Sequence, residues 1–232
     1  MATINVYSGG APKEALLILT PQFEQRTGHK LNYTYAVISE IQKRLAAGGT
    51  PDMVFMPVPA IDALVKAGTL KLQPRAVLGS VGIGVIVRAG APHPDISMPE
   101  HFKNALLSAR SIVHANPNAT PSGAHLANVA QELGIETELQ RKLTYSNALD
   151  GGVERITTGE ADIGIYPVSE VIAVEGVALV GLLPPALQSL IVYGAAVLTE
   201  SAAPEPAEAF IAFLSDPAHR SVWEDAGFEP AV

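Results

Sequence analysis

Short apolar runs alternate with amphipathic stretches along the whole chain, and this alternation constrains the fold more than any other feature of the sequence. The apolar runs predict strands at residues 4–7, 31–35, 53–56, 82–87, 111–114, 143–145, 163–166 and 190–198. The stretches between them predict helices at about residues 12–27, 39–47, 60–67, 99–108, 122–133, 136–142, 152–158, 204–215 and 217–226. Because parallel strands need long crossover connections, usually helices, this order predicts parallel α/β sheets.

Glycine and proline mark the predicted helix ends. Glycines stand where left-handed C-terminal caps belong, at Gly28, Gly48, Gly134 and Gly159. Prolines stand in the predicted first turns, at Pro12, Pro99, Pro204 and Pro217. Both patterns support the helix assignments.

Two segments of the chain are similar to each other. Residues 44–57, "RLAAGGTPDMVFMP", and residues 155–167, "RITTGEADIGIYP", each run from a helix end through Gly and Asp into a short apolar strand that ends in Pro. One interpretation is that any α/β unit is punctuated in this way. The other is that the chain contains two similar α/β lobes, residues 1–84 with 192–232 and an inserted lobe at 85–191, with connections near residues 88–92 and 184–191.

Three strand-to-helix corners contain small or hydroxyl-bearing residues: Ser8-Gly9-Gly10-Ala11, Val37-Ile38-Ser39 and Thr120-Pro121-Ser122-Gly123. In open α/β sheets, ligands bind outside the carboxyl ends of the strands. The N–H groups of a first helical turn lack intrahelical partners and the helix dipole is positive there, so each corner is suited to an anion. In the alternative, Ser39 and Ser122 only cap their helices. Ser39 has Gln42 three residues on, which is the capping-box spacing.

Charge and residue usage argue against several classes of function. The net charge is −8 without a basic cluster, which argues against a nucleic-acid partner. The chain has no cysteine and no G-x-S-x-G motif, so neither of these nucleophiles is indicated. The six histidines lack metal-ligand spacing, and no apolar stretch is long and unbroken enough to span a membrane. We therefore expect no metal, no cofactor and no membrane span.

A few ionisable side chains could take part in chemistry at these corners. His125 lies in the first turn of the helix after the third corner, and Glu170 follows the strand at residues 163–166. Either could act in acid–base catalysis; alternatively, His125 faces solvent and Glu170 begins a short helix. Arg44 could neutralise a carboxylate, and Arg155 is a further candidate.

The order of these elements resembles that of the periplasmic molybdate-binding proteins of ABC transporters. The likeness runs from "VYSGGAPKEALLILTPQFEQRTGHKLNYTYAVISEIQKRLAAGGTPDMVFMP" through "VGIGVIVRAG" and "NPNATPSGAHLANVAQELGI" to "GEADIGIYPVSEV". It implies a type II periplasmic-binding-protein fold, in which two α/β lobes are joined by two crossover segments and close over a ligand in the cleft between them. It also implies a monomer, a periplasmic location and a possible ABC transporter permease as partner. Because Met1 leads directly into a strand, a cytoplasmic location is expected if Met1 is the native start.

The resemblance also implies a site, from which this sequence departs. The molybdate binders hold a tetrahedral oxyanion with serines at the first two corners, backbone amides and a tyrosine of the second lobe. Here the first serine position falls near Ala11 with Ser8 close by, Val37 and Ile38 take part of the second cluster and leave Ser39, and the tyrosine position falls at Pro167 beside Tyr166. This departure is similar to the organic-acid branch of the family, which includes aconitate isomerase.

These observations predict an extracytoplasmic solute-binding protein for a small anion, either an oxyanion such as molybdate or a small carboxylate. The expected ligand-binding residues are Ser8, Gly9, Gly10, Ala11, Val37, Ile38, Ser39, Arg44, Ser122, Gly123 and Tyr166. The alternative is an isomerase of an unsaturated polycarboxylic acid on the same fold, with His125 and Glu170 as the catalytic candidates.

Overall fold

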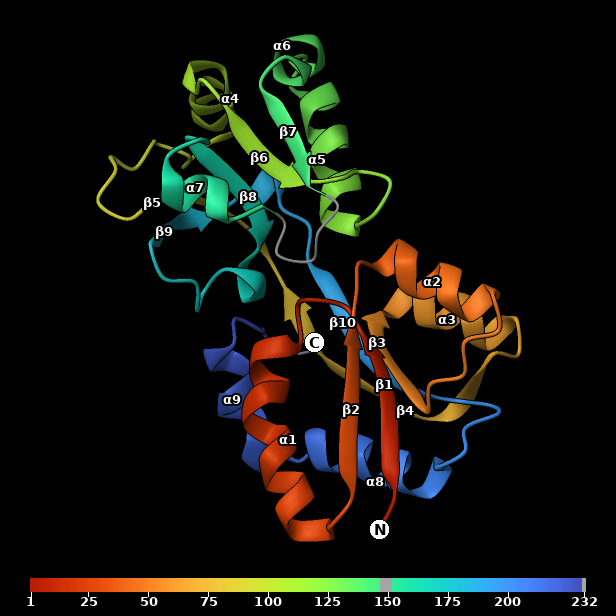
Figure 1. Cartoon of the computed structure of the whole chain (residues 1–232). Coiled ribbons are helices and arrows are strands. Elements are labelled where there is room, and N and C mark those ends of the chain that lie inside the picture. The colour runs from red at the N-terminus through yellow and green to blue at the C-terminus, as the bar shows by residue number, and fades with distance from the viewer. Residues whose placement is uncertain (147–151, 231–232) are drawn as a thin grey trace. The chain divides into compact units, whose positions relative to one another are not determined.

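The predicted strands assemble into two five-stranded sheets in the computed structural model, which describes residues 1–146 and 152–230. The chain divides into two compact units (Figure 1). Unit 1 is formed by Met1–Val81 and Val192–Val232, and unit 2 is formed by Gly82–Ile191. The division expected from the sequence, at residues 84/85 and 191/192, stays a prediction of where one lobe ends and the other begins.

The sheet of unit 1 has the strand order β2-β1-β3-β10-β4. Its strands are β1 (Thr3–Ser8), β2 (Lys30–Tyr35), β3 (Met53–Pro57), β4 (Leu70–Val81) and β10 (Ile191–Leu198). β1 is parallel to β2 and β3, whereas β10 is antiparallel to β3. In this register Ser8 lies opposite Tyr35 and Phe55, so the carboxyl ends of the three parallel strands meet at one edge.

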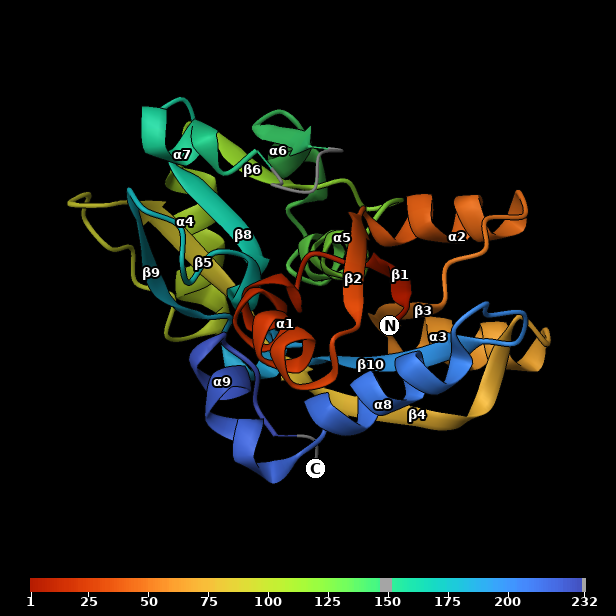
Figure 2. The same cartoon turned by 60° about the horizontal axis from the view of Figure 1, so that its bottom comes forward.

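Helices cover both faces of this sheet (Figure 2). They are α1 (Lys13–Thr27), α2 (Ile38–Ala46), α3 (Val58–Lys66), α8 (Pro204–Leu214) and α9 (Arg220–Asp225), the last preceded by the 3-10 helix η3 (Pro217–His219). Val54 and Met56 pack with Ile41 of α2 and Ile61 of α3 in one apolar cluster. Phe55 points to the opposite face, because side chains alternate along a strand, and its ring lies 6.3 Å from that of Phe210 on α8.

The sheet of unit 2 has the order β7-β6-β8-β5-β9. Its elements are β5 (Ile83–Arg88), α4 (Pro99–Ser108), β6 (Ile112–Ala115), α5 (Pro121–Glu132), α6 (Glu136–Gln140), β7 (Leu143–Ser146), α7 (Glu154–Thr158), β8 (Ile163–Pro167), η1 (Val168–Glu170), β9 (Val177–Leu182) and η2 (Pro185–Leu187). β6 is parallel to β7 and β8, and β5 is antiparallel to β8 and β9.

The two sheets follow one plan. Reading both orders from the left, β2, β1, β3, β10 and β4 correspond to β7, β6, β8, β5 and β9. The two similar segments of the sequence therefore lead into equivalent central strands, β3 and β8. This confirms the interpretation that the chain holds two similar α/β lobes. In both units an aspartate, Asp52 or Asp162, directly precedes the equivalent strand.

Three expectations from the sequence are corrected by the structure. β4 and β9 are strands that the apolar pattern did not indicate; both are outer strands of their sheets, and β4 is largely half-buried or exposed. The capping box at Ser39 is wrong, since α2 begins at Ile38 with Val37 as its N-cap and no side-chain cap bond. The first connection lies at Val81–Gly82, not near residues 88–92, because β5 belongs wholly to the second sheet.

Within the described part of the chain, no helix has the length and apolar character needed to cross a lipid bilayer.

Candidate functional site

The first two corners lie side by side at the carboxyl edge of the unit 1 sheet. Ser8 ends β1, and its backbone carbonyl accepts a hydrogen bond from the N–H of Ala36 at 3.0 Å. Val37 then caps α2 in extended conformation, with φ −63° and ψ 151°. The N–H groups of Ile38 and Ser39, at the first two helical positions, have no intrahelical acceptors. Backbone donors are therefore available at the α2 corner.

Gly9 lies in close contact with its neighbours. Its N–H donates to the Phe55 carbonyl at 3.0 Å and is thus committed to the fold. A Cβ at this position would lie 2.9 Å from Cδ1 of Ile38 and 3.5 Å from Cε1 of Tyr193. A side chain there would therefore require the end of the Ile38 side chain to move.

Few side-chain oxygens are available to a ligand at the carboxyl edge of the unit 1 sheet. Ser8 is fully buried and its hydroxyl donates to the Gly9 carbonyl at 2.8 Å. Ser39 is half-buried in the first turn of α2, and no other described side chain or backbone group hydrogen-bonds to its hydroxyl. Ala11 and Ile38 are buried apolar residues. The edge therefore combines backbone N–H groups, one available hydroxyl and apolar surface, with Gly10 half-buried between them.

The third corner is capped by Thr120, not by the serine that follows it. The Thr120 hydroxyl accepts from the N–H of Gly123 at 3.1 Å and lies 3.3 Å from the hydroxyl of Ser122, which is 2 % exposed. Gly123 lets the first turn of α5 press on the end of β6, since a Cβ there would lie 2.6 Å from the Asn116 carbonyl oxygen. The corner thus places two hydroxyls at a helix N-terminus.

Two histidines of unit 2 hydrogen-bond to backbone carbonyls. His125 on α5 donates from Nε2 to the Leu187 carbonyl at 2.7 Å, because a carbonyl oxygen can only accept. His114 on β6 is 1 % exposed and donates from Nδ1 to the Ile165 carbonyl at 2.8 Å. Its Nε2 has no hydrogen-bond partner among the described residues. The residue helps to line a cavity together with Leu126 and Leu139. Burial lowers the pKa of His114, which favours the neutral form of the ring.

Glu170 is an ionisable group without a described partner beside the carboxyl end of β8. It closes η1, directly after the strand, and no described residue forms a hydrogen bond or ion pair with its carboxylate. Burial raises the pKa of Glu170 to about 7. The neighbouring Ser169 hydroxyl is also buried without a described partner. A carboxyl that is half ionised near neutral pH can both accept and donate a proton.

Two further predicted ligand residues, Tyr166 and Arg44, have described contacts within their own units. Tyr166 is 1 % exposed and its ring packs among Ile86, Val113 and Ile156. Arg44 lies in the last turn of α2, at the other end of the helix from Ser39, and pairs with Glu40 at 2.8 Å.

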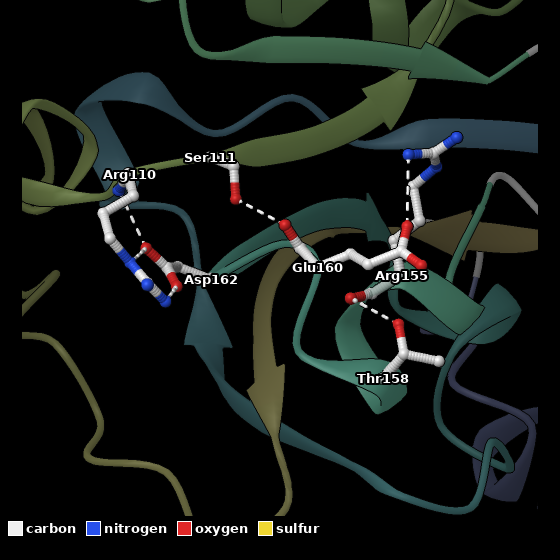
Figure 3. Close-up of polar contacts among 6 residues, drawn as sticks. All are labelled: Arg110, Ser111, Arg155, Thr158, Glu160 and Asp162. Carbon is white, nitrogen blue, oxygen red and sulfur yellow. Dashed lines mark hydrogen bonds and ion pairs between the residues drawn. The ribbon is translucent and has the colours of Figure 1, made fainter.

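The arginines of unit 2 that are paired with carboxylates lie at the opposite edge of its sheet. Figure 3 shows Arg110 holding Asp162 just before β8, through ion-pair contacts of 2.6 and 3.2 Å, and Arg155 reaching Glu160 at 3.4 Å. These residues flank the amino ends of β6 and β8, whereas Glu170 follows the carboxyl end. In the described ranges, no three His, Asp or Glu side chains come close enough together to hold a metal ion.

An α/β chain with two matching units, each with helix N-termini and small residues at its parallel edge, has the architecture of a small-ligand binding protein. The comparisons agree: the profile of the bacterial extracellular solute-binding protein family matches residues 4–229. The chain belongs to this family.

Sequence relatives confirm the predicted resemblance. An aconitate isomerase from Pseudomonas sp. is 31% identical over 99% of this chain and 88% of its own length. The molybdate-binding protein of Mycobacterium tuberculosis is 25% identical over 97% of this chain and 84% of its own length.

Solved structures confirm the predicted fold. The periplasmic molybdate-binding protein of Azotobacter vinelandii superposes with a TM-score of 0.83 at 20% identity, covering 99% of this chain and 100% of that chain. The sulfate-binding protein of Mycobacterium tuberculosis gives a TM-score of 0.78 at 22% identity, covering 100% and 88%. The two-lobed type II binding-protein fold is therefore correct.

Proposed function

We propose that this chain is an extracytoplasmic solute-binding protein that captures a small anion by closure of its two units. The observation that carries the proposal is the pair of helix N-termini at the parallel edges. The first turns of α2 and α5 each combine N–H groups that lack intrahelical acceptors with serine or threonine hydroxyls. Helix dipoles are positive at these ends and favour negative charge. Ser8, Gly10, Ser39, Ser122 and Gly123 are the residues that we place around the anion.

We further infer that the anion is a small carboxylate. Ala11, Val37 and Ile38 stand where the resemblance expects oxygen donors, and their apolar side chains supply none; Val37, which is half-buried, is the most exposed of the three. A tetrahedral oxyanion would leave oxygens unpaired there, at about 1–3 kcal/mol for each buried unsatisfied group. An organic acid has a carbon skeleton that can lie against these side chains while its carboxylates meet the helix ends.

The location and the partner belong to the same proposal. The family description and the transporter proteins among the relatives support a periplasmic location and an ABC transporter permease as partner. A monomer is the expected state.

A second function is favoured by Glu170. Moving a double bond within an unsaturated polycarboxylate requires a base that removes a proton from one carbon and returns one to another, with no other atom exchanged. Glu170 has a pKa of about 7 and no described partner, so both of its protonation states are present at neutral pH. The aconitate isomerase among the relatives supports this alternative.

A thermal-shift series against molybdate, tungstate, sulfate, phosphate and a panel of di- and tricarboxylates including trans-aconitate tests the proposal. A ligand at a hundred times its Kd stabilises by about 2.7 kcal/mol, which is a shift of roughly 5–10 °C for a chain of this size. We expect the shift with carboxylates. A shift with molybdate or tungstate alone would exclude the carboxylate inference, and no shift with any anion would exclude anion capture.

Turnover distinguishes the two functions. Incubation with trans-aconitate, followed by chromatography, reports any cis-aconitate formed. If the isomerase alternative is correct, Glu170→Gln abolishes the conversion while the thermal shift with trans-aconitate persists. A wild-type protein that binds trans-aconitate without converting it is a binding protein only.

A further inference from the structure

Two adjacent residues at the carboxyl edge of the unit 2 sheet have polar side chains without partners. Ser169 and Glu170 belong to η1, which follows β8 directly. The Ser169 hydroxyl is buried and forms no hydrogen bond with a described residue, and the Glu170 carboxyl forms neither a hydrogen bond nor an ion pair with one. Buried polar groups in folded proteins nearly always have a partner. This corner therefore has unused capacity to bind a polar ligand.

The fixed cations of unit 2 lie elsewhere. Residues 82–191 contain six lysines and arginines. Arg110 and Arg155 pair with carboxylates near the amino ends of β6 and β8 (Figure 3). The other four are Arg88, at the end of the antiparallel β5, Lys103, in the middle of α4, and Arg141 and Lys142, just before β7. None of the six follows the carboxyl end of a parallel strand, so an anion at this edge meets only the partial charge of the α5 N-terminus.

The protonation state of Glu170 decides whether it attracts or repels such an anion. An ionised carboxylate only accepts hydrogen bonds and repels another carboxylate, whereas a protonated carboxyl donates one. Burial raises the pKa of Glu170 to about 7, so its proton is available near neutral pH. The residue is half-buried, so part of it remains accessible.

We propose that Glu170 binds a carboxylate of the ligand while it is itself protonated, so that the protein captures each anion together with one proton. The proton takes the place of the cation that this edge lacks. The Glu170 O–H donates a hydrogen bond to one oxygen of the ligand, and no covalent bond forms or breaks. The proposal rests on the proposed function, because it needs a ligand with a carboxylate, and it holds whether or not the ligand is then converted.

Proton capture makes the affinity depend on pH in a defined direction. Below the pKa of Glu170 in the free protein the acid already carries its proton, and the affinity is constant. Above this pKa, binding takes up a proton from solution, so the affinity falls as pH rises. We expect the affinity for trans-aconitate to fall about tenfold between pH 6 and pH 8. Carboxyls ordinarily ionise at about pH 4, so the charge of the ligand itself stays constant over this interval.

Other ionisable groups on the surrounding elements do not explain this dependence. Burial is the only cause of the raised pKa of Glu170. Imidazole is the side chain that ordinarily titrates near neutral pH, so His125 is the group to be separated from Glu170 by experiment. The ionisable residues of the elements around η1 are Arg88 of β5, His125 of α5, Glu154 and Arg155 of α7, Asp162 and Tyr166 at the two ends of β8, and Glu175 before β9.

Calorimetric titration with trans-aconitate tests the proposal. Repeating the titration at pH 8 in buffers of different ionisation enthalpy gives the number of protons taken up per anion, which should be close to one at pH 8 and close to zero at about pH 5.5. Glu170→Gln keeps a donor but cannot ionise, so it should bind equally well at pH 6 and pH 8 without proton uptake. Glu175→Gln, at an exposed position, is the matched control and should behave as the wild type.

Each other outcome is decisive. Binding of trans-aconitate without proton uptake at pH 8 would overturn the proposal and leave the proposed function intact. Uptake that persists in Glu170→Gln and disappears in His125→Gln would overturn it as well. If no anion binds at either pH, the proposed function fails and this proposal fails with it.

One check needs no ligand. Carbon NMR of the Glu170 carboxyl in the free protein should show a titration midpoint near pH 7. A midpoint at the ordinary value of about 4.3 would overturn the proposal, even if an anion binds.

Discussion

We expect one residue, Val37, to affect both the stability of α2 and the choice of anion. It occupies the N-cap of α2 but provides no side-chain cap bond. Serine at an N-cap stabilises a helix by about 1 kcal/mol relative to alanine. We therefore expect Val37→Ser to melt about 2–4 °C above Val37→Ala in a thermal scan.

Val37→Ser and Val37→Ala also test which kind of anion the site prefers. The added hydroxyl supplies one oxyanion partner, so Val37→Ser should shift the ratio of molybdate to trans-aconitate affinity towards molybdate by about tenfold. Titration calorimetry with both anions measures this ratio. A ratio that moves equally in Val37→Ala would mean that lost apolar contact, not the hydroxyl, is responsible.

Glu170 makes stability depend on pH in a defined direction. Burial raises its folded-state pKa to about 7, above the ordinary value of about 4.3. Between these pH values the folded protein holds a proton that the unfolded chain has released, so the free energy of unfolding falls as pH rises towards 7 and levels off above it. Glu170→Gln removes this loss.

Melting scans from pH 4 to pH 9 check this expectation. At about pH 4, Glu170→Gln should have the same free energy of unfolding as the wild type. Above about pH 7, its free energy of unfolding should exceed that of the wild type by on the order of 1–3 kcal/mol. The exposed Glu175 provides the matched control, because Glu175→Gln should follow the wild type at every pH. A difference between Glu170→Gln and the wild type that does not vary with pH would contradict the raised pKa of Glu170.

At the scale of elements, the equivalent aspartates before β3 and β8 differ in burial and in hydrogen-bond partners. Asp52 is 2 % exposed and accepts from the N–H of Asn5 at 2.8 Å, the N–H of Ala203 at 3.0 Å and the Ser201 hydroxyl at 2.8 Å. It thereby links β1, β3 and the start of α8. Asp162 instead pairs with Arg110, whose side chain is 84 % exposed.

Removing these carboxylates should therefore differ in cost. Asp52→Ala leaves several buried donors unpaired and should lower the free energy of unfolding by about 3 kcal/mol, whereas Asp162→Ala should lower it by about 1 kcal/mol. Urea denaturation of both variants gives the comparison. Equal losses would show that the burial of Asp52 does not decide its contribution.

Elements with a clear apolar pattern could be predicted from the sequence, and the outer strands of the sheets could not. Central strands such as β3 and β8 are buried on both faces and read as continuous apolar runs. The sequence does not predict β4, because its exposed stretches and Pro74 hide any alternation of apolar and polar residues. The sequence predicts the start of α2 one residue too late, because its N-cap, Val37, is an apolar residue that carries no capping signal.

The candidate site can be read from the sequence only in part. The sequence predicts the corners because glycine, serine and threonine have known uses before helices. His114 and Gln188 belong to no motif, and only the folded chain shows that their polar atoms meet the backbone of distant residues. The sequence also suggested Arg44 as a ligand cation, and only the structure shows that it lies in the last turn of α2, paired with Glu40.

For the whole molecule, the two units differ in how their sheets are assembled from the chain. All five strands of the unit 2 sheet lie within residues 82–191, whereas the unit 1 sheet needs β10, which comes after them. A fragment of residues 82–191 should therefore fold alone and show a cooperative urea transition by circular dichroism. A fragment of residues 1–81 lacks the strand between β3 and β4 and should show none.

The interleaved order of the strands has a consequence for how the protein is made. As the nascent chain leaves the ribosome, β1, β2 and β3 emerge first, with the edge of β3 that will receive β10 still bare. That edge carries buried apolar residues such as Val54 and Phe55, and an unpaired apolar edge is a template for wrong pairing. It must wait until the whole inserted unit has been synthesised, and that unit can complete its own sheet meanwhile. Biosynthesis is thus the period in which this chain most needs a chaperone, and the first third of the sequence is the part to be held.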